Sequence, residues 1–110
     1  MTKHRLAGTA LGAAVLLAST SLETAAPPPA PVKVGFVYVG PVGDAGWTFQ
    51  HDVARKQMEA ALKGRVTTQF VENVAEGPDS ERVIRSMAQG GAKIIFATSF
   101  GYMNPVINVA

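Results

Sequence analysis

The stretch Val32-Lys-Val-Gly-Phe-Val-Tyr-Val39 runs directly into the glycine-rich segment Gly40-Pro-Val-Gly-Asp-Ala-Gly46. Apart from Lys33, the first stretch is apolar on both alternating sides, which is the pattern of a strand buried on both faces of a parallel sheet. The second stretch is rich in turn-forming residues. Between residues 47 and 63, apolar residues recur at helical spacing. The order of strand, loop and helix is typical of the start of a parallel α/β fold.

Two more strand–helix pairs follow in the sequence. Residues 66–74 alternate between polar and apolar side chains, which favours a more exposed strand at an edge of the sheet. Asp79 stands where it could cap a second helix. Residues 93–98 are apolar again and predict a third, buried strand. Asn104-Pro105 then opens a third helix, with proline expected at its first position.

The predicted fold is an open parallel α/β sheet with flanking helices, in the order β-α-β-α-β-α. Because the alternating strand belongs at an edge and the two apolar strands belong inside, we expect the strand order 2-1-3, with right-handed crossovers. In this order the chain reverses direction between strands one and three. Ligands of open α/β sheets bind at such a switch point, outside the carboxyl ends of the strands. The loops at that point are residues 40–47 and residues 99–104.

Both loops carry groups that suit a flat, polar small molecule. Asp44 could accept hydrogen bonds from ring N–H groups or sugar hydroxyls, and Trp47 offers an indole face for stacking. Phe100 and Tyr102 could form the opposite wall, and Asn104 supplies an amide that both donates and accepts. Structural roles stay open beside these: Trp47 as a core anchor, Asp44 as a turn or capping residue, Phe100 in packing, and Asn104 as the cap of its own helix.

Other chemistries lack their motifs. The absence of Cys excludes disulfides, thiolate metal sites, thiol catalysis and a lipid anchor on an N-terminal Cys. The first loop reads G-x-x-G-x-x-G rather than the dinucleotide fingerprint, and neither a phosphate loop nor a nucleophile elbow occurs. His51 has no second metal ligand at helical spacing, and Asp52 can pair with Arg55 or Lys56. We therefore expect a binding protein rather than an enzyme, with no catalytic residues, metal or cofactor.

Charge gives no argument for a nucleic-acid partner, because ten basic residues face eight acidic ones without forming a basic stripe. Residues 1–26 have the three parts of a secretory signal peptide: a basic start at residues 3–5, an apolar stretch at residues 6–18 and a polar segment. The alternative is an ordinary buried helix, and the cleavage site stays open. Residues 27–31 predict a stiff, proline-rich spacer. We therefore expect export, to the periplasm in a Gram-negative bacterium.

Three segments carry a family resemblance. They are residues 33–55, which contain the run GDAGWTFQHD; residues 72–85, which contain the run VAEGPDSERV; and residues 97–105, which contain the run SFGYMNP. Together they resemble the basic membrane protein family of ABC transporter substrate-binding proteins over about residues 32–110. The resemblance implies part of the first lobe of a type I periplasmic binding protein, whose two α/β lobes close on a ligand. The chain is then expected to be the N-terminal part of a longer protein.

The resemblance also implies a ligand, a partner and site residues. Family members deliver purine nucleobases or nucleosides to an ABC importer, whose permease in the inner membrane would be the partner. The family's ligand-contacting aspartate and aromatic residue fall on Asp44 and Trp47, and Thr48 departs from the usual asparagine in a way that favours an adenine-like base. The loop after the third strand adds Phe100, Gly101, Tyr102 and Asn104. Two alternatives stay open: a sensory receptor of the same fold, and an exported nucleoside-processing enzyme.

Overall fold

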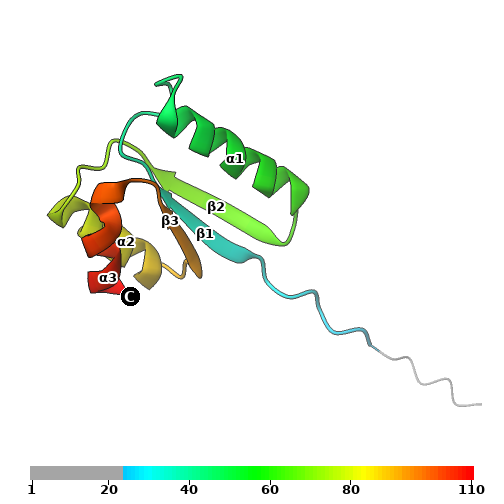
Figure 1. Cartoon of the computed structure of the whole chain (residues 1–110). Coiled ribbons are helices and arrows are strands. Elements are labelled where there is room, and N and C mark those ends of the chain that lie inside the picture. Colours follow the sequence, from blue (N-terminus) through cyan, green and yellow to red (C-terminus); the bar gives the residue numbers. More distant parts are fainter. Residues whose placement is uncertain (1–23) are drawn as a thin grey trace, which may run out of the picture.

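Three parallel strands with helices on both faces make up the folded part of the chain (Figure 1). This computed structural model describes residues 24–110. The elements are β1 (Val32–Val37), α1 (Trp47–Ala61), β2 (Val66–Val71), α2 (Pro78–Gln89), β3 (Ile94–Ala97), the 3₁₀ turn η1 (Phe100–Tyr102) and α3 (Met103–Val109). The strand order is β2-β1-β3, with both pairs parallel, so the predicted fold class and strand order are confirmed.

The central strand β1 supplies the core of both faces. Val34, Phe36 and Tyr38 are buried on the side covered by α1. Val37 is buried on the opposite side, where it joins the cluster formed with α2 and the chain end. Side chains on both faces of β1 are buried. This burial explains why the sequence of the strand is apolar on both alternating sides.

Gly35 lets α2 approach the sheet closely. A Cβ at this position would lie 2.7 Å from the Sδ atom of Met87, a buried residue of α2.

The start of α2 differs from the sequence prediction. The helix begins at Pro78 and follows Gly77, whose φ is +88°, so Asp79 lies inside the first turn and is not the N-cap. Glycine at a positive φ turns the chain directly into a proline that suits the first helical position.

Element ends also differ from the sequence expectations by a few residues. The strand β2 ends at Val71 rather than at residue 74, and β3 spans only Ile94–Ala97. The third helix begins at Met103, so Pro105 occupies its third position rather than its first. The 3₁₀ turn η1 runs directly into α3, so helical backbone begins before the position that Pro105 indicates. These shifts leave both predicted loops at the carboxyl edge of the sheet.

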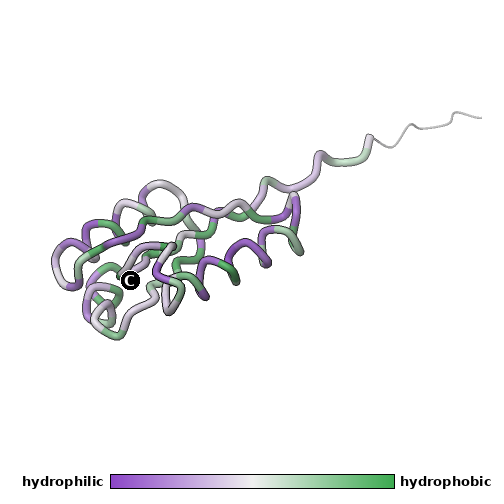
Figure 2. Tube along the Cα trace, turned by 90° about the horizontal axis from the view of Figure 1, so that it is seen from above, coloured by the Kyte–Doolittle hydropathy of each residue, from purple (hydrophilic) through white to green (hydrophobic). Residues whose placement is uncertain are grey.

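The buried side of α1 is polar. Its buried residues are Thr48, Asp52 and Arg55. The apolar residues that made the helix recognisable are not its buried set: Phe49 is 42% exposed and Ala54 is also exposed. Hydrophilic and hydrophobic residues accordingly alternate along this helix in Figure 2. Apolar spacing thus predicted the helix correctly without predicting the side that packs on the sheet.

Residues 24–31 have no regular secondary structure, are exposed, and lead away from the sheet (Figure 1). They include the predicted spacer at residues 27–31. Most of the predicted signal peptide, residues 1–23, lies outside the described residues. Among the helices that the structure describes, none combines the length and the apolar character needed to cross a membrane.

Candidate functional site

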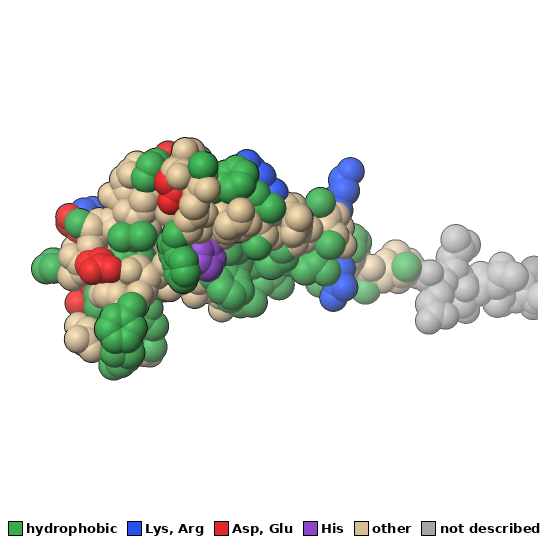
Figure 3. All heavy atoms as spheres, turned by 45° about the horizontal axis from the view of Figure 1, so that its top comes forward, with side chains coloured by type: hydrophobic (Ala, Val, Ile, Leu, Met, Phe, Trp, Pro, Cys, Tyr) green, Lys and Arg blue, Asp and Glu red, His purple; other side chains and the backbone are tan. Residues whose placement is uncertain are grey.

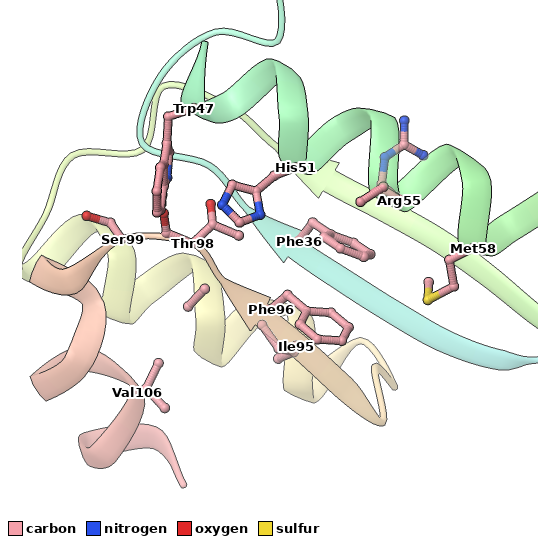
Figure 4. A pocket seen from close by; sticks show the side chains of 12 residues that line it. Phe36, Trp47, His51, Arg55, Met58, Ile95, Phe96, Thr98, Ser99 and Val106 are labelled. Atoms are coloured by element: carbon pink, nitrogen blue, oxygen red, sulfur yellow. The ribbon is translucent and has the colours of Figure 1, made fainter.

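Trp47 joins the two predicted loops. It is the first residue of α1, and its indole Nε1 donates a hydrogen bond of 2.6 Å to the carbonyl oxygen of Thr98, just after β3. The ring also meets the imidazole of His51 edge-on, with 4.8 Å between the ring centroids (Figure 4). The side of the residue away from these contacts is open, since 61% of Trp47 is exposed. The indole is therefore fixed at its polar edge and free on its face.

A groove of about 820 Å³ runs from Trp47 along β3. Its lining is largely apolar and comes from α1, the sheet, the segment after β3 and α3. It includes Trp47, His51, Arg55, Met58, Phe96, Thr98, Ser99 and Val106 (Figure 4). In the space-filling view of Figure 3, the histidine lies among hydrophobic side chains. The floor includes the stacked rings of Phe36 and Phe96, 5.0 Å apart. An apolar trough with a few polar groups at one end is typical of a small-molecule site.

Asp44 is bound to the start of α1. Its Oδ1 atom accepts from the backbone N–H groups of Gly46 at 2.8 Å and Phe49 at 2.9 Å, and its Oδ2 atom accepts from Thr48 N–H at 3.0 Å. The N–H groups of Gly46 and Phe49 hold the pKa of Asp44 below its usual range. The side chain is exposed. The carboxylate thus satisfies free N–H groups of the helix start while remaining open to solvent.

The remaining predicted site residues occupy different environments. Thr48 is fully buried, and its Oγ1 atom accepts from Gly40 N–H at 3.3 Å. Phe100 is 86% exposed beside Gly101. Tyr102 is fully buried and donates a 2.6 Å hydrogen bond to the Val74 carbonyl.

Asn104 is exposed in the first turn of α3, in a shallow depression shared with α2. The structure therefore brings Asp44, Trp47 and Thr48 together at one helix start. Of the predicted site residues, Trp47 alone lines the groove; Tyr102 lies in the core and Asn104 lies beside α2. The ligand contacts expected of all the predicted site residues stay predictions.

A third loop, between β2 and α2, reaches both predicted loops, and sequence reasoning missed it. The Oε2 atom of Glu72 accepts from Val42 N–H at 2.6 Å in the first loop. The Oε1 atom of Glu76 accepts from the Ser99 hydroxyl, and its carboxylate packs where a Cβ on Gly101 would stand. The signal available was positional: two carboxylates follow the end of a strand that neighbours the switch point.

Reactive groups are few in this region. Within residues 24–110, no group of three or more His, Asp or Glu side chains is arranged to hold a metal ion. Burial, with a smaller effect of Glu76, raises the pKa of Tyr102 to about 12. Burial also raises the pKa of Tyr38. Both tyrosines are therefore neutral near pH 7.

Comparison with solved structures finds the same fold in part of a larger protein. An ABC transporter solute-binding protein from Conexibacter woesei matches with a TM-score of 0.65 and 23% identity, over 72% of this chain and 25% of that chain. At this identity the match shows the shared fold. No family model matches the sequence.

Two curated relatives share more of the sequence. A purine-binding protein of Brucella abortus is 60% identical over 79 residues, which are 72% of this chain and 23% of the relative. A Haloferax volcanii protein, named as a candidate ABC transporter glucose-binding protein, is 40% identical over 79 residues, which are 20% of its length. The chain therefore spans less than a quarter of each relative that it matches. One of these relatives is thus named for binding purines and the other for binding glucose.

Proposed function

We propose that this chain forms part of the ligand-binding lobe of an exported substrate-binding protein that delivers a purine base or nucleoside to an ABC importer. The observation that carries the proposal is the exposed face of Trp47 at the carboxyl edge of the sheet. Because the Thr98 carbonyl already occupies the indole N–H, the part of Trp47 left for a ligand is its π face. A flat aromatic base gains roughly 1–3 kcal/mol from such stacking.

Three further features support the purine assignment. The 60% identity to a purine-binding protein exceeds the 40% identity to the relative named for glucose. Phe100 is strongly exposed on the loop after β3, where it could cover a ligand. Asp44 keeps an acceptor position on Oδ2 for a ring N–H or a ribose hydroxyl, because that oxygen accepts one backbone N–H bond whereas Oδ1 already accepts two. We assign the whole protein to the basic membrane protein family, with a second lobe closing over the ligand and the periplasm as its location.

A sugar ligand is the second candidate, and the name of the Haloferax volcanii relative favours it. An exposed indole face would also accept the apolar face of a pyranose. The two ligands differ in what they require around the ring: a base needs few hydrogen bonds at its edges, whereas a sugar needs a partner for most of its hydroxyls. The largely apolar lining beside Trp47 suits the base better.

Thermal unfolding with a ligand panel tests the proposal. Adenine, guanine, adenosine, glucose and an amino acid mixture would be compared on the full-length protein, as wild type and as Trp47→Ala. A ligand at one hundred times its Kd should add about 2.7 kcal/mol of stability, seen as a higher melting temperature. We expect a rise with adenine or adenosine that Trp47→Ala removes. The exposed variant Phe49→Ala, two residues along the same helix, should keep it. A rise with glucose alone would overturn the purine assignment.

A further inference from the structure

The polar side of α1 calls for an explanation that packing alone does not supply. A helix on a sheet ordinarily buries an apolar stripe. Here the buried row is Thr48, Asp52 and Arg55, which are 0%, 4% and 9% exposed. Burying charged groups costs free energy unless their hydrogen bonds are made, so such a row needs partners throughout.

Arg55 makes most of these bonds. Its Nε and Nη2 atoms both lie 2.8 Å from Oδ1 of Asp52, one turn earlier on the same helix. Its Nη1 atom donates at 2.8 Å to the hydroxyl of Thr68 on β2. The guanidinium carbon also lies 4.7 Å from the ring centroid of Phe70, another β2 residue. Arg55 therefore connects α1 to the edge strand by a directional bond and a cation–π contact.

The same row reaches the candidate ligand site. Thr48, at its N-terminal end, fixes the first turn of α1 to the end of β1 through the Gly40 N–H. Trp47 is the neighbouring residue, and its N–H bond to the Thr98 carbonyl spans to β3. A helix held by apolar contacts can shift along a sheet, whereas directional hydrogen bonds admit one arrangement. The placement of the indole therefore depends on how α1 is held at Thr48 and at Arg55.

We propose that Arg55 is a positioning residue of the ligand site: by tying α1 to Thr68 on β2, it sets the place and limits the motion of the Trp47 indole. The proposal rests on the purine-binding function only for its effect on affinity. The motion of the indole can be measured without any ligand, and Trp47 is the only tryptophan in the sequence. Its fluorescence therefore reports on the proposed effect directly.

The first test replaces the buried pair by apolar residues of similar size, in the full chain with Asp52→Leu and Arg55→Met together. Replacing a buried ion pair in this way is often neutral for stability. We expect a melting temperature close to the wild type, a larger amplitude of indole motion in time-resolved anisotropy, and adenine binding weaker by about tenfold. The control is Arg82→Met, which removes an exposed pair of the same spacing, 2.9 Å to Asp79 on α2. It should change neither readout.

A second, milder variant keeps the proposal testable if the double variant does not fold. Thr68→Val removes the hydroxyl on β2 that accepts from Arg55 and donates to Glu59, and it leaves the Asp52–Arg55 pair in place. Thr67→Val, its exposed neighbour, is the control. We expect freer indole motion in Thr68→Val and wild-type behaviour in Thr68→Ser, which keeps the hydroxyl. Folded variants with wild-type anisotropy would overturn the positioning role. A full-length protein that binds no adenine would contradict the proposed function instead, and the anisotropy of the 110-residue chain would still decide the role of Arg55.

Discussion

Two side chains of the candidate site, Trp47 and Asp44, make hydrogen bonds within the fold and are also exposed. Sequence reasoning left two roles open for Trp47 and for Asp44, and the geometry accommodates both. Trp47 anchors through its N–H while its face is exposed. The Asp44 carboxylate binds three backbone N–H groups while it remains at the surface. The residue types predicted that Trp47 and Asp44 could bind a ligand or support the fold. They did not predict which of their atoms bond within the fold, because this depends on where each loop meets its neighbours.

The neighbouring aromatics of the last loop show the same limit. Phe100 is 86% exposed and Tyr102 is fully buried, although both belong to one 3₁₀ turn. A shift of two residues in such a tight turn points the side chains in different directions. The sequence offered no helical or strand periodicity in this segment to decide which aromatic faces the core.

The two buried tyrosines give a matched pair of predictions. Tyr102 donates to the Val74 carbonyl at 2.6 Å, whereas the hydroxyl of Tyr38 has no hydrogen-bond partner within residues 24–110 and lies near the charged Asp52 and Arg55. Tyr102→Phe leaves a buried carbonyl unpaired and should lower the free energy of unfolding by about 1–3 kcal/mol. Tyr38→Phe removes a buried hydroxyl that gains nothing, so it should be neutral or stabilising. Urea unfolding followed by circular dichroism measures both; an equal loss in the two variants would contradict this reading.

At the scale of elements, the sequence predicted the features that follow from burial of apolar side chains. Alternation along residues 66–74 correctly predicted β2 at an edge, and its absence along β1 correctly predicted the central strand. The expectation that β3 is buried inside was wrong for the described sheet: β3 lies at the other edge, and its residues are exposed or half-buried because no further strand covers it there. The same reasoning could not identify the buried side of α1. Apolar spacing describes packing that is driven by the hydrophobic effect, and this helix is held by an ion pair and hydrogen bonds. Such a network becomes visible only when β2 is in place.

The start of α1 carries a prediction about pH. Backbone N–H groups depress the pKa of Asp44, so its contribution to stability is present above the ordinary aspartate value near 4 and is lost as pH falls through the lower folded value. Asp44→Asn should therefore lower the stability at neutral pH. It should also reduce the part of the stability that the wild type loses below about pH 4.

Urea unfolding midpoints measured at a series of pH values check this. Asp79→Asn is the control, because Asp79 lies in the first turn of α2 and pairs with the exposed Arg82. The difference between the wild type and Asp44→Asn should shrink on acidification. Two curves that stay parallel across the acid range would contradict the capping role of Asp44.

For the molecule as a whole, the sheet topology located the candidate site before any side chain was placed. The strand order put the loops after β1 and β3 side by side, as the Trp47–Thr98 bond shows. The topology rule did not draw attention to the loop after β2, because that strand lies at the outer edge. Glu72 and Glu76 are nevertheless bonded to the other two loops. A site assembled from three loops needs their lengths and bends, which residue patterns do not determine.

The same architecture leaves β3 at the other edge of the described sheet, with an apolar surface beside it. Ile94 is 49% exposed and Phe96 is 45% exposed, and the groove runs along this strand. Unpaired strand edges next to apolar surface favour association between chains. We therefore expect the 110-residue chain to self-associate as its concentration rises. Ile94→Lys should shift this association to higher concentration, because a charge on an edge strand opposes pairing.

Analytical ultracentrifugation over a concentration series measures the effect. Ile107→Lys is the matched control: it removes an isoleucine that is 66% exposed, but on α3 rather than on the sheet edge. If the edge drives association, Ile94→Lys should change the sedimentation much more than Ile107→Lys. Equal effects of the two substitutions would indicate general surface hydrophobicity as the cause. A wild type that stays monomeric throughout would show that the twist and shortness of β3 already protect this edge, since short edge strands resist pairing.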